Sequence, residues 1–331
     1  MLAALQTNLN EVRVEWVGRQ PAEFGQVHIK MSAAGICGAQ LMELAGTKAS
    51  GPFPHIMGHE GVGYVQSVGH GVSTVKEGDK VVLHWRKGDG IESDFPTYIH
   101  DGQKITSGKV VTWAQEVTVS ENRATRVPDD APDELCVLLG CSLSTALGTL
   151  EQEAKLKMGE SLLIIGAGGL GMSLLHASAY FHPSMVSIVD THLKDINKPR
   201  GIPHGFIVCS PEWNHPGMLQ GTYDAVIDTT GNCEALEAAV ERLNPSGRLI
   251  MVGQPTGAFS IKGGHRLFSG EGITIKATQG GGFQPDKDIH RYLSSKVDFS
   301  GIVTHRIALE EINQGIELVK QGNAGRVLIQ L

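Results

Sequence analysis

The chain has 331 residues, which is long enough for two domains that each bury a core of their own. Hydrophobic residues make up 41% and charged residues 19%, and the net charge is −7, which is typical of a soluble globular protein and argues against nucleic-acid binding. The first ten residues lack the basic and apolar segments of a signal peptide, so we expect a cytoplasmic protein that does not bind membranes.

The first part of the chain is predicted to be rich in β-strands. Its short runs of β-branched residues are separated by glycine, proline and aspartate, which is the pattern of strands joined by turns. The strands are expected at 12–16, 27–31, 63–68 and 80–84. Residues 86–112 are polar and rich in glycine, and they predict a long loop or lobe.

From about residue 143 the pattern changes to strands that alternate with helices. This alternation predicts a parallel sheet with right-handed crossovers. The strands are expected at 161–165, 186–189, 224–228, 248–252 and 273–276, with a helix over 232–243. The last segment predicts a helix with Ile312, Ile316 and Val319 on one face, followed by a strand at 326–329.

A glycine-rich turn joins the first of these strands to a helix-like run over 172–179. Glycines in this context allow a tight turn and a close approach of the backbone to a pyrophosphate, and the helix start offers free N–H groups. The turn therefore predicts a dinucleotide-binding site. The expected contacts are Gly166, Gly168, Gly169, Leu170 and Gly171.

Asp190 closes the next strand, at the distance from the glycines where a carboxylate accepts the hydroxyls of a ribose. The two following residues, Thr191 and His192, offer no arginine for a 2′-phosphate, which favours NAD over NADP. Lys194 and Lys198 lie nearby, so NADP stays an alternative.

Three separate segments carry residues that bind metals. The five cysteines are scattered and odd in number, which favours metal or core roles over disulfides. Cys37, His59 and Cys141 offer two thiolates and an imidazole, a set that suits Zn²⁺ with one open position. Spacing alone does not join the three, and each is also compatible with a buried core residue.

Several segments together resemble the zinc-containing alcohol dehydrogenases of the medium-chain dehydrogenase/reductase superfamily. They include GICG from residue 35, GHEGVG from residue 58, GCSLSTALGT from residue 140, and GAGGLG from residue 166. The resemblance covers essentially the whole chain. It implies an α/β fold with a β-rich, GroES-like catalytic domain over 1–143 and 286–331. The remaining residues, 144–285, are implied to form a Rossmann domain with a doubly wound parallel sheet.

The resemblance also implies roles for single residues. Cys37, His59 and Cys141 match the catalytic zinc ligands of the family. Glu60 matches an acid beside the metal that can approach it as the fourth ligand.

Two further residues match cofactor contacts of the family. Thr145 matches a hydroxyl that contacts the nicotinamide, and Arg326 matches a basic residue that reaches the pyrophosphate. The implied cofactors are therefore one catalytic zinc ion and NAD.

The chain departs from the family at the usual proton relay. Ala39 and Met42 stand where a hydroxyl and a histidine are usual, so the hydroxyl proton needs another acceptor. We rank His84 before Glu60 in this role, because an imidazole titrates near neutral pH whereas a metal ion keeps a nearby acid ionised.

Two other departures concern the metal. Gln40 replaces the aspartate that usually supports the zinc site. Residues 86–112 contain no cysteine, although relatives often hold a structural zinc there with four, so we expect one zinc ion per chain.

The predicted function is that of a zinc- and NAD-dependent alcohol dehydrogenase. Its substrate is expected to be a polar or polyhydroxylated secondary alcohol, interconverted with its ketone or aldehyde. The alternatives are a zinc-free NADPH-dependent enone or quinone reductase, and an inactive binding protein. We also expect a homodimer or homotetramer joined through edge strands at 270–282.

Overall fold

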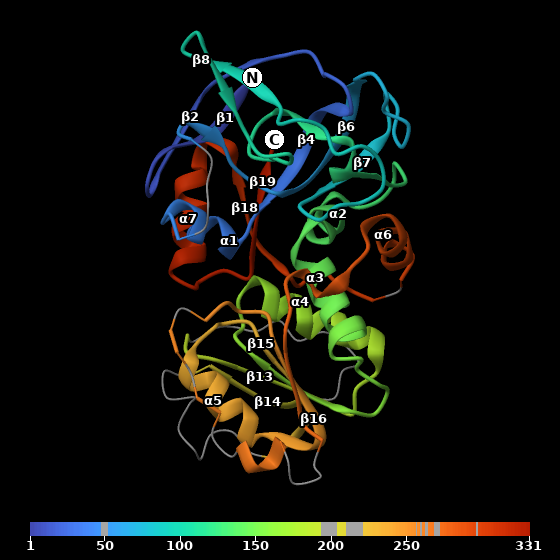
Figure 1. Cartoon of the computed structure of the whole chain (residues 1–331), viewed down its shortest axis with the longest axis vertical. Helices are drawn as coiled ribbons and strands as arrows, with labels where there is room; N and C mark the ends of the chain where they lie inside the picture. Colours follow the sequence, from blue (N-terminus) through green and yellow to red (C-terminus); the bar gives the residue numbers. More distant parts are fainter. Residues whose placement is uncertain are drawn as a thin grey trace. The chain divides into compact units, whose positions relative to one another are not determined.

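The computed structural model describes residues 1–47, 52–192, 204–209, 221–255, 257–258, 260–261, 264–267, 272–295 and 297–331. It divides into two compact units (Figure 1). The first unit comprises Met1–Ser144, Gln284–Ser295 and Val303–Leu331, and the second comprises Thr145–Phe283 and Lys296–Ile302. The sequence predicted domain boundaries after residues 143 and 285.

The first unit is built mainly of antiparallel strands. Its main sheet has the order β11-β7-β6-β4-β19-β18, and β10 also pairs with β4. Two smaller sheets have the orders β2-β1-β5 and β3-β8-β9. The strands are β1 (Leu2–Asn8), β2 (Glu11–Trp16), β3 (Gly18–Arg19), β4 (Gln26–Ile36), β5 (His55–Ile56), β6 (Glu60–Val68), β7 (Lys80–His84), β8 (Thr97–His100), β9 (Gln103–Thr106), β10 (Glu116–Ser120), β11 (Ala124–Arg126), β18 (Val303–Ala308) and β19 (Arg326–Gln330).

Four helices accompany these strands, and a fifth, α3, runs from the first unit into the second. They are α1 (Gly38–Leu44), α2 (Asp133–Gly140), α3 (Ser142–Gly148), α6 (Pro285–Leu293) and α7 (Ile312–Lys320). Within the described residues no single helix is long and apolar enough to cross a membrane; α2 and the stretch from Ser142 to Glu153 meet that criterion only together, with a 61° bend.

Strand β4 organises the first unit. It is almost continuously buried because it pairs with β6, β10 and β19, so both of its edges and most of its side chains are covered. The core around it contains the fully buried rings of Tyr98 and Trp113. Since β19 comes from the end of the chain, the main sheet joins segments that are far apart in the sequence.

The prediction of a loop over 86–112 was wrong in part. Strands β8 and β9 form a hairpin there, with Thr97 opposite Thr106. Asp101 and Gly102 both have positive φ, as a two-residue hairpin turn requires, and Asp-Gly is a strong local signal for that turn. The polar composition of the segment concealed this signal.

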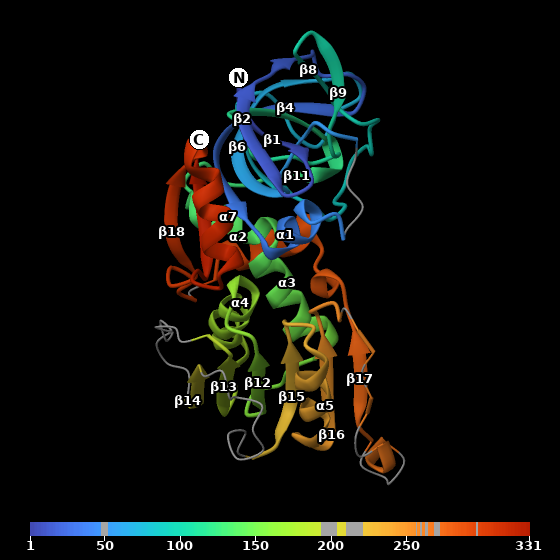
Figure 2. The ribbon, with the colours of Figure 1, turned by 90° about the vertical axis from the view of Figure 1, so that its left-hand side faces the viewer.

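The second unit is a six-stranded parallel sheet, which confirms the predicted doubly wound α/β fold. The strand order, β14-β13-β12-β15-β16-β17, is that of a dinucleotide-binding domain, and Figure 2 shows β14 and β17 at its two edges. The strands are β12 (Ser161–Ile165), β13 (Met185–Asp190), β14 (His204–Cys209), β15 (Tyr223–Asp228), β16 (Leu243–Met251) and β17 (Thr274–Ala277). Helix α4 (Gly169–Ser178) packs on β12 and β13, and α5 (Cys233–Glu241) packs on β15 and β16.

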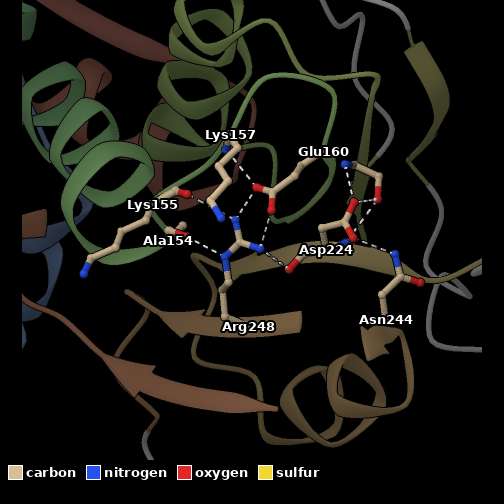
Figure 3. A network of polar contacts seen from close by, with 8 residues as sticks. Ala154, Lys155, Lys157, Glu160, Asp224, Asn244 and Arg248 are labelled. Atoms are coloured by element: carbon tan, nitrogen blue, oxygen red, sulfur yellow. Dashed lines mark hydrogen bonds and ion pairs between the residues drawn. The ribbon is translucent and has the colours of Figure 1, made fainter. Parts of the chain in front are cut away.

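A partly buried guanidinium ties the start of this sheet together (Figure 3). Arg248 of β16 binds the carboxylate of Glu160, the carbonyl of Ala154 and the carbonyl of Asp224. The Asp224 side chain in turn accepts a hydrogen bond from Asn244 at 2.9 Å. These contacts fix the turn that leads into β12, and therefore the strand from which the glycine turn departs.

Candidate metal centre and nucleotide-binding turn

The three predicted zinc ligands converge in the first unit. Cys37 follows β4 and caps α1, His59 directly precedes β6, and Cys141 lies between α2 and α3. The sulfur atoms of Cys37 and Cys141 are 3.9 Å apart, and Nε2 of His59 lies 3.2 Å from the Cys141 sulfur. The ends of one strand, one helix and one loop thus bring together residues that span more than a hundred positions.

This geometry fits a tetrahedral zinc ion. With Zn–S bonds of about 2.3 Å, two thiolates on one ion lie about 3.8 Å apart. Three protein ligands leave a fourth position open, as in catalytic zinc sites. Within the described part of the chain, Cys37, His59 and Cys141 are the one group of three metal-binding side chains at this spacing.

The pKa values of the two thiols shift in opposite directions. A hydrogen bond from Cys141, helped by the charge of Arg326, lowers the pKa of Cys37 well below its usual range. The same pairing, together with burial, raises the pKa of Cys141. One negative charge is therefore already favoured at the centre, and a bound cation would stabilise the second thiolate.

Gln40 of α1 contacts the centre. Its side chain is fully buried, and its carbonyl oxygen accepts a hydrogen bond from the backbone N–H of Cys37 at 2.8 Å. Its amide nitrogen contacts Nδ1 of His59. The sequence identified Gln40 only as a departure from the family; the structure shows that it contacts two of the three ligand residues.

Glu60 lies beside the centre in a fully buried ion pair with Arg326, at 3.3 Å. Burial raises the pKa of Glu60 to about 7, although the charge of Arg326 opposes this rise. Arg326 also donates to the carbonyl of Ile36, at 2.9 Å. Two glycines make room for the acid: a Cβ at Gly35 would lie 2.3 Å from the Glu60 carboxylate, and one at Gly140 would lie 3.1 Å from its Cα.

Arg326 is thus held inside the first unit by Glu60 and Ile36. Burial alone would lower the pKa of Arg326, but the negative charges of Glu60 and Cys37 raise it, so the guanidinium stays charged. Its predicted contact with a pyrophosphate stays a prediction.

His84 is buried at the end of β7, and both of its ring nitrogens have partners. Nδ1 lies 2.8 Å from the carbonyl of Arg86, and Nε2 lies 2.8 Å from the hydroxyl of Thr125. Thr125 also donates to Asp286, at 2.8 Å. Burial lowers the pKa of His84 to about 4, so the expectation that this imidazole titrates near neutral pH was wrong, and the ring is neutral at physiological pH.

The glycine turn of the second unit has the geometry that its sequence predicts. Gly166 has a φ of 97°, and a Cβ at Gly171 would lie 1.8 Å from the Gly166 carbonyl, so both positions require glycine. A Cβ at Gly168, which caps α4, would meet nothing within 4 Å. Open space at a helix start is where an anionic group binds backbone N–H groups.

Asp190 ends β13 next to this turn. Its carboxylate accepts hydrogen bonds from the backbone N–H groups of Ala167, at 2.6 Å, and His192, at 2.7 Å. Lys194 and Lys198, which kept NADP as an alternative cofactor in the sequence analysis, lie outside the described residues.

Thr145 is buried in the second unit, where its carbonyl approaches Gly281.

Comparisons with known proteins agree with the sequence-based resemblance. Residues 23–129 match the family model of the alcohol dehydrogenase GroES-like domain. Alcohol dehydrogenase 6 of Peromyscus maniculatus is 27% identical, with 96% of this chain and 93% of that protein aligned. S-(hydroxymethyl)glutathione dehydrogenase of Paracoccus denitrificans is 26% identical, with 92% of each chain aligned.

Solved structures show the same fold over the full length. Benzyl alcohol dehydrogenase of Acinetobacter calcoaceticus superimposes with a TM-score of 0.83 at 23% identity, covering 100% of this chain and 99% of that one. A 2R,3R-butanediol dehydrogenase of Bacillus subtilis gives a TM-score of 0.76 at 21% identity, with 100% and 99% covered.

Proposed function

We propose that this chain is an NAD-dependent member of the zinc-containing alcohol dehydrogenases of the medium-chain dehydrogenase/reductase superfamily and that it acts on a polar secondary alcohol. The observation that carries the proposal is the spacing of Cys37, His59 and Cys141, which suits a zinc ion with one open position. The relatives that align with nearly all of this chain are named as alcohol-oxidising dehydrogenases, which supports the proposed activity.

The residues of the first unit provide the metal chemistry. A zinc ion at such a centre supplies Lewis acidity, which lowers the pKa of an alcohol. Cys37, His59 and Cys141 would hold it, and the Glu60–Arg326 pair would set the charge around it. We further propose that Glu60 can act as the fourth zinc ligand, because it follows His59 directly in the chain.

The second unit provides the nucleotide site. A nicotinamide cofactor supplies the hydride acceptor for the reaction. The N–H groups at the start of α4 would bind its pyrophosphate, and Asp190 would accept the ribose hydroxyls, which supports NAD. We further propose that Thr145 contacts the nicotinamide and that Arg326 contributes to the pyrophosphate site.

For the hydroxyl proton we propose His84 as the acceptor, before Glu60. Its low pKa keeps the imidazole neutral, as an acceptor must be. Nδ1 faces a carbonyl and therefore carries the hydrogen, which leaves Nε2 as the basic nitrogen. The single hydroxyl hydrogen of Thr125 then goes either to Nε2 or to Asp286, and not to both. The same low pKa makes His84 a weak base, so its pH–rate profile is the discriminating measurement.

The test combines metal analysis with a substrate panel. Purified protein is assayed for zinc, and a series of alcohols and ketones, including diols and cyclic polyols, is tested with NAD(H) and NADP(H) by the absorbance of the reduced nicotinamide. We expect one zinc ion per chain and NAD-linked oxidation. Zinc-free protein that reduces enones with NADPH would favour the reductase alternative. Cofactor binding without turnover on any substrate would favour an inactive binding protein.

A further inference from the structure

The buried amide of Gln40 makes two contacts that fix its orientation. It lies between the backbone N–H of Cys37 and Nδ1 of His59. A peptide N–H can only donate, so the carbonyl end of the amide must face Cys37. The NH₂ end therefore faces His59, and because an amide NH₂ can only donate, Nδ1 of His59 must accept.

This arrangement assigns the proton on His59. A neutral imidazole has one N–H, and if Nδ1 accepts a hydrogen bond the hydrogen is on Nε2. Nε2 lies 3.2 Å from the sulfur of Cys141, which can accept that hydrogen. The hydrogen bonds then form a chain in which Cys37 donates to Gln40, Gln40 donates to His59 and His59 donates to Cys141.

A metal-bound histidine needs the opposite tautomer. The ligand atom on the side of Cys141 is Nε2, so its lone pair must be free and the hydrogen must move to Nδ1. Nδ1–H would then point at the NH₂ group of Gln40, where two donors oppose each other. A carboxylate in this position would avoid the conflict, because it accepts from both Cys37 and His59.

We propose that Gln40 holds His59 in the tautomer that cannot bind zinc, so that metal uptake requires its amide to turn over and to give up the hydrogen bond from Cys37. This inference rests on the proposed zinc site and makes Gln40 a positioning residue that weakens zinc binding. Partners of metal-bound histidines change metal affinity by about 10–100-fold, which sets the size of the expected effect.

The first test reads the tautomer directly, without metal or substrate. Protein labelled with ¹⁵N-histidine is stripped of metal and examined by long-range ¹H–¹⁵N correlation at about pH 8, where an ordinary imidazole is neutral. We expect His59 as the Nε2–H tautomer in the native chain and as the Nδ1–H tautomer in Gln40→Glu. The Nδ1–H tautomer in the native metal-free chain would overturn the proposal.

The second test measures zinc affinity by competition with a chromophoric chelator. Gln40→Glu keeps the length of the side chain and should tighten zinc by about 10–100-fold. Gln40→Met removes both contacts and should also tighten zinc, though by less than Gln40→Glu, because it relieves the conflict without supplying an acceptor for His59. A loss of about 10–100-fold in Gln40→Met would show that Gln40 supports zinc binding and would overturn the proposal.

A matched control separates hydrogen bonding from charge. Gly38→Asp adds the same negative charge next to Cys37, at a position where a Cβ meets nothing within 4 Å. If it tightens zinc as much as Gln40→Glu does, charge alone explains the effect and the proposal is wrong. If no variant binds zinc, the proposed function fails, while the tautomer measurement still decides the role of Gln40.

Discussion

At the scale of single residues, Glu60 and Arg326 depend on each other because both are out of contact with water. At about pH 9, above the pKa of Glu60, Arg326→Met would leave a buried carboxylate without its counter-charge, and we expect a loss of about 3–5 kcal/mol in the free energy of unfolding. Urea denaturation of the metal-free protein measures this loss. Adding Glu60→Gln to the same chain should recover most of it; no recovery would show that packing, rather than charge, explains the loss.

The same pair predicts how stability depends on pH. The folded-state pKa of Glu60, about 7, lies above its ordinary value of 4.5, so the folded protein binds this proton more tightly than the unfolded chain does. The contribution of Glu60 is therefore fully present below about pH 4.5 and is lost as the pH rises to about 7. Arg326→Met should raise the upper pH limit of this stabilisation. Denaturation curves at several pH values, recorded for the native protein, Arg326→Met and Glu60→Gln, would measure it.

His84 gives a prediction about turnover. If it accepts the hydroxyl proton, His84→Phe should lower kcat by about 10²–10⁴-fold, and the loss should shrink at high pH because hydroxide substitutes for the base. With a pKa of about 4, the native imidazole should produce no acid limb near neutral pH in the pH–rate profile. Zinc content and NAD affinity serve as controls. Near-normal turnover in His84→Phe would move the role to Glu60 or to water.

Asp190 predicts the choice of cofactor. Its carboxylate would repel a 2′-phosphate, so the native enzyme should use NAD better than NADP. Asp190→Ser removes charged hydrogen bonds worth about 1.5–3 kcal/mol each, so KM for NAD should rise by about 10–100-fold while NADP improves relative to it. Steady-state kinetics with both cofactors would measure this, and equal use of NADP by the native enzyme would contradict it.

At the scale of elements, two glycines at the start of α4 should respond differently to the same change. Gly171→Ala forces a Cβ against the carbonyl of Gly166 and should destabilise the protein by about 1–3 kcal/mol or more. Gly168→Ala meets open space, so the fold should persist while NAD binding weakens. Thermal unfolding and NAD titration of the two variants separate the effects; unchanged NAD affinity in Gly168→Ala would argue against a pyrophosphate there.

Elements defined by local patterns were predictable, whereas those defined by distant pairing were not. The strand at 80–84 and the glycine turn follow from their own residues, because alternation and glycine geometry are local. The edge strand β14 and the length of β4 depend on neighbouring strands and were missed or shortened. The contacts of Gln40 and the Glu60–Arg326 pair could not be predicted, because their partners come together only in the folded chain.

At the scale of the whole molecule, we predict a homodimer or homotetramer joined through β17. This strand lies at an edge of the parallel sheet, so its outer N–H and C=O groups can pair with a second copy. Residues 270–271 of the predicted interface lie outside the described residues. Thr274→Asp would place two like charges across a symmetric edge and should halve the mass seen by light scattering. Gln103→Asp, in the β8–β9 hairpin, is the matched control; a monomeric native protein would refute the interface.

The position of β19 in the chain has a consequence for biosynthesis. Arg326 leaves the ribosome long after Glu60, and at about 5–20 residues per second the interval is roughly 15–50 s. During that time the second unit, whose strands are contiguous in the chain, can fold by itself. The first unit must wait for its last strand, and until then its cysteines lack the charge of Arg326, which helps to lower the pKa of Cys37. The reactive thiolate at this centre therefore forms only late in the synthesis of the chain.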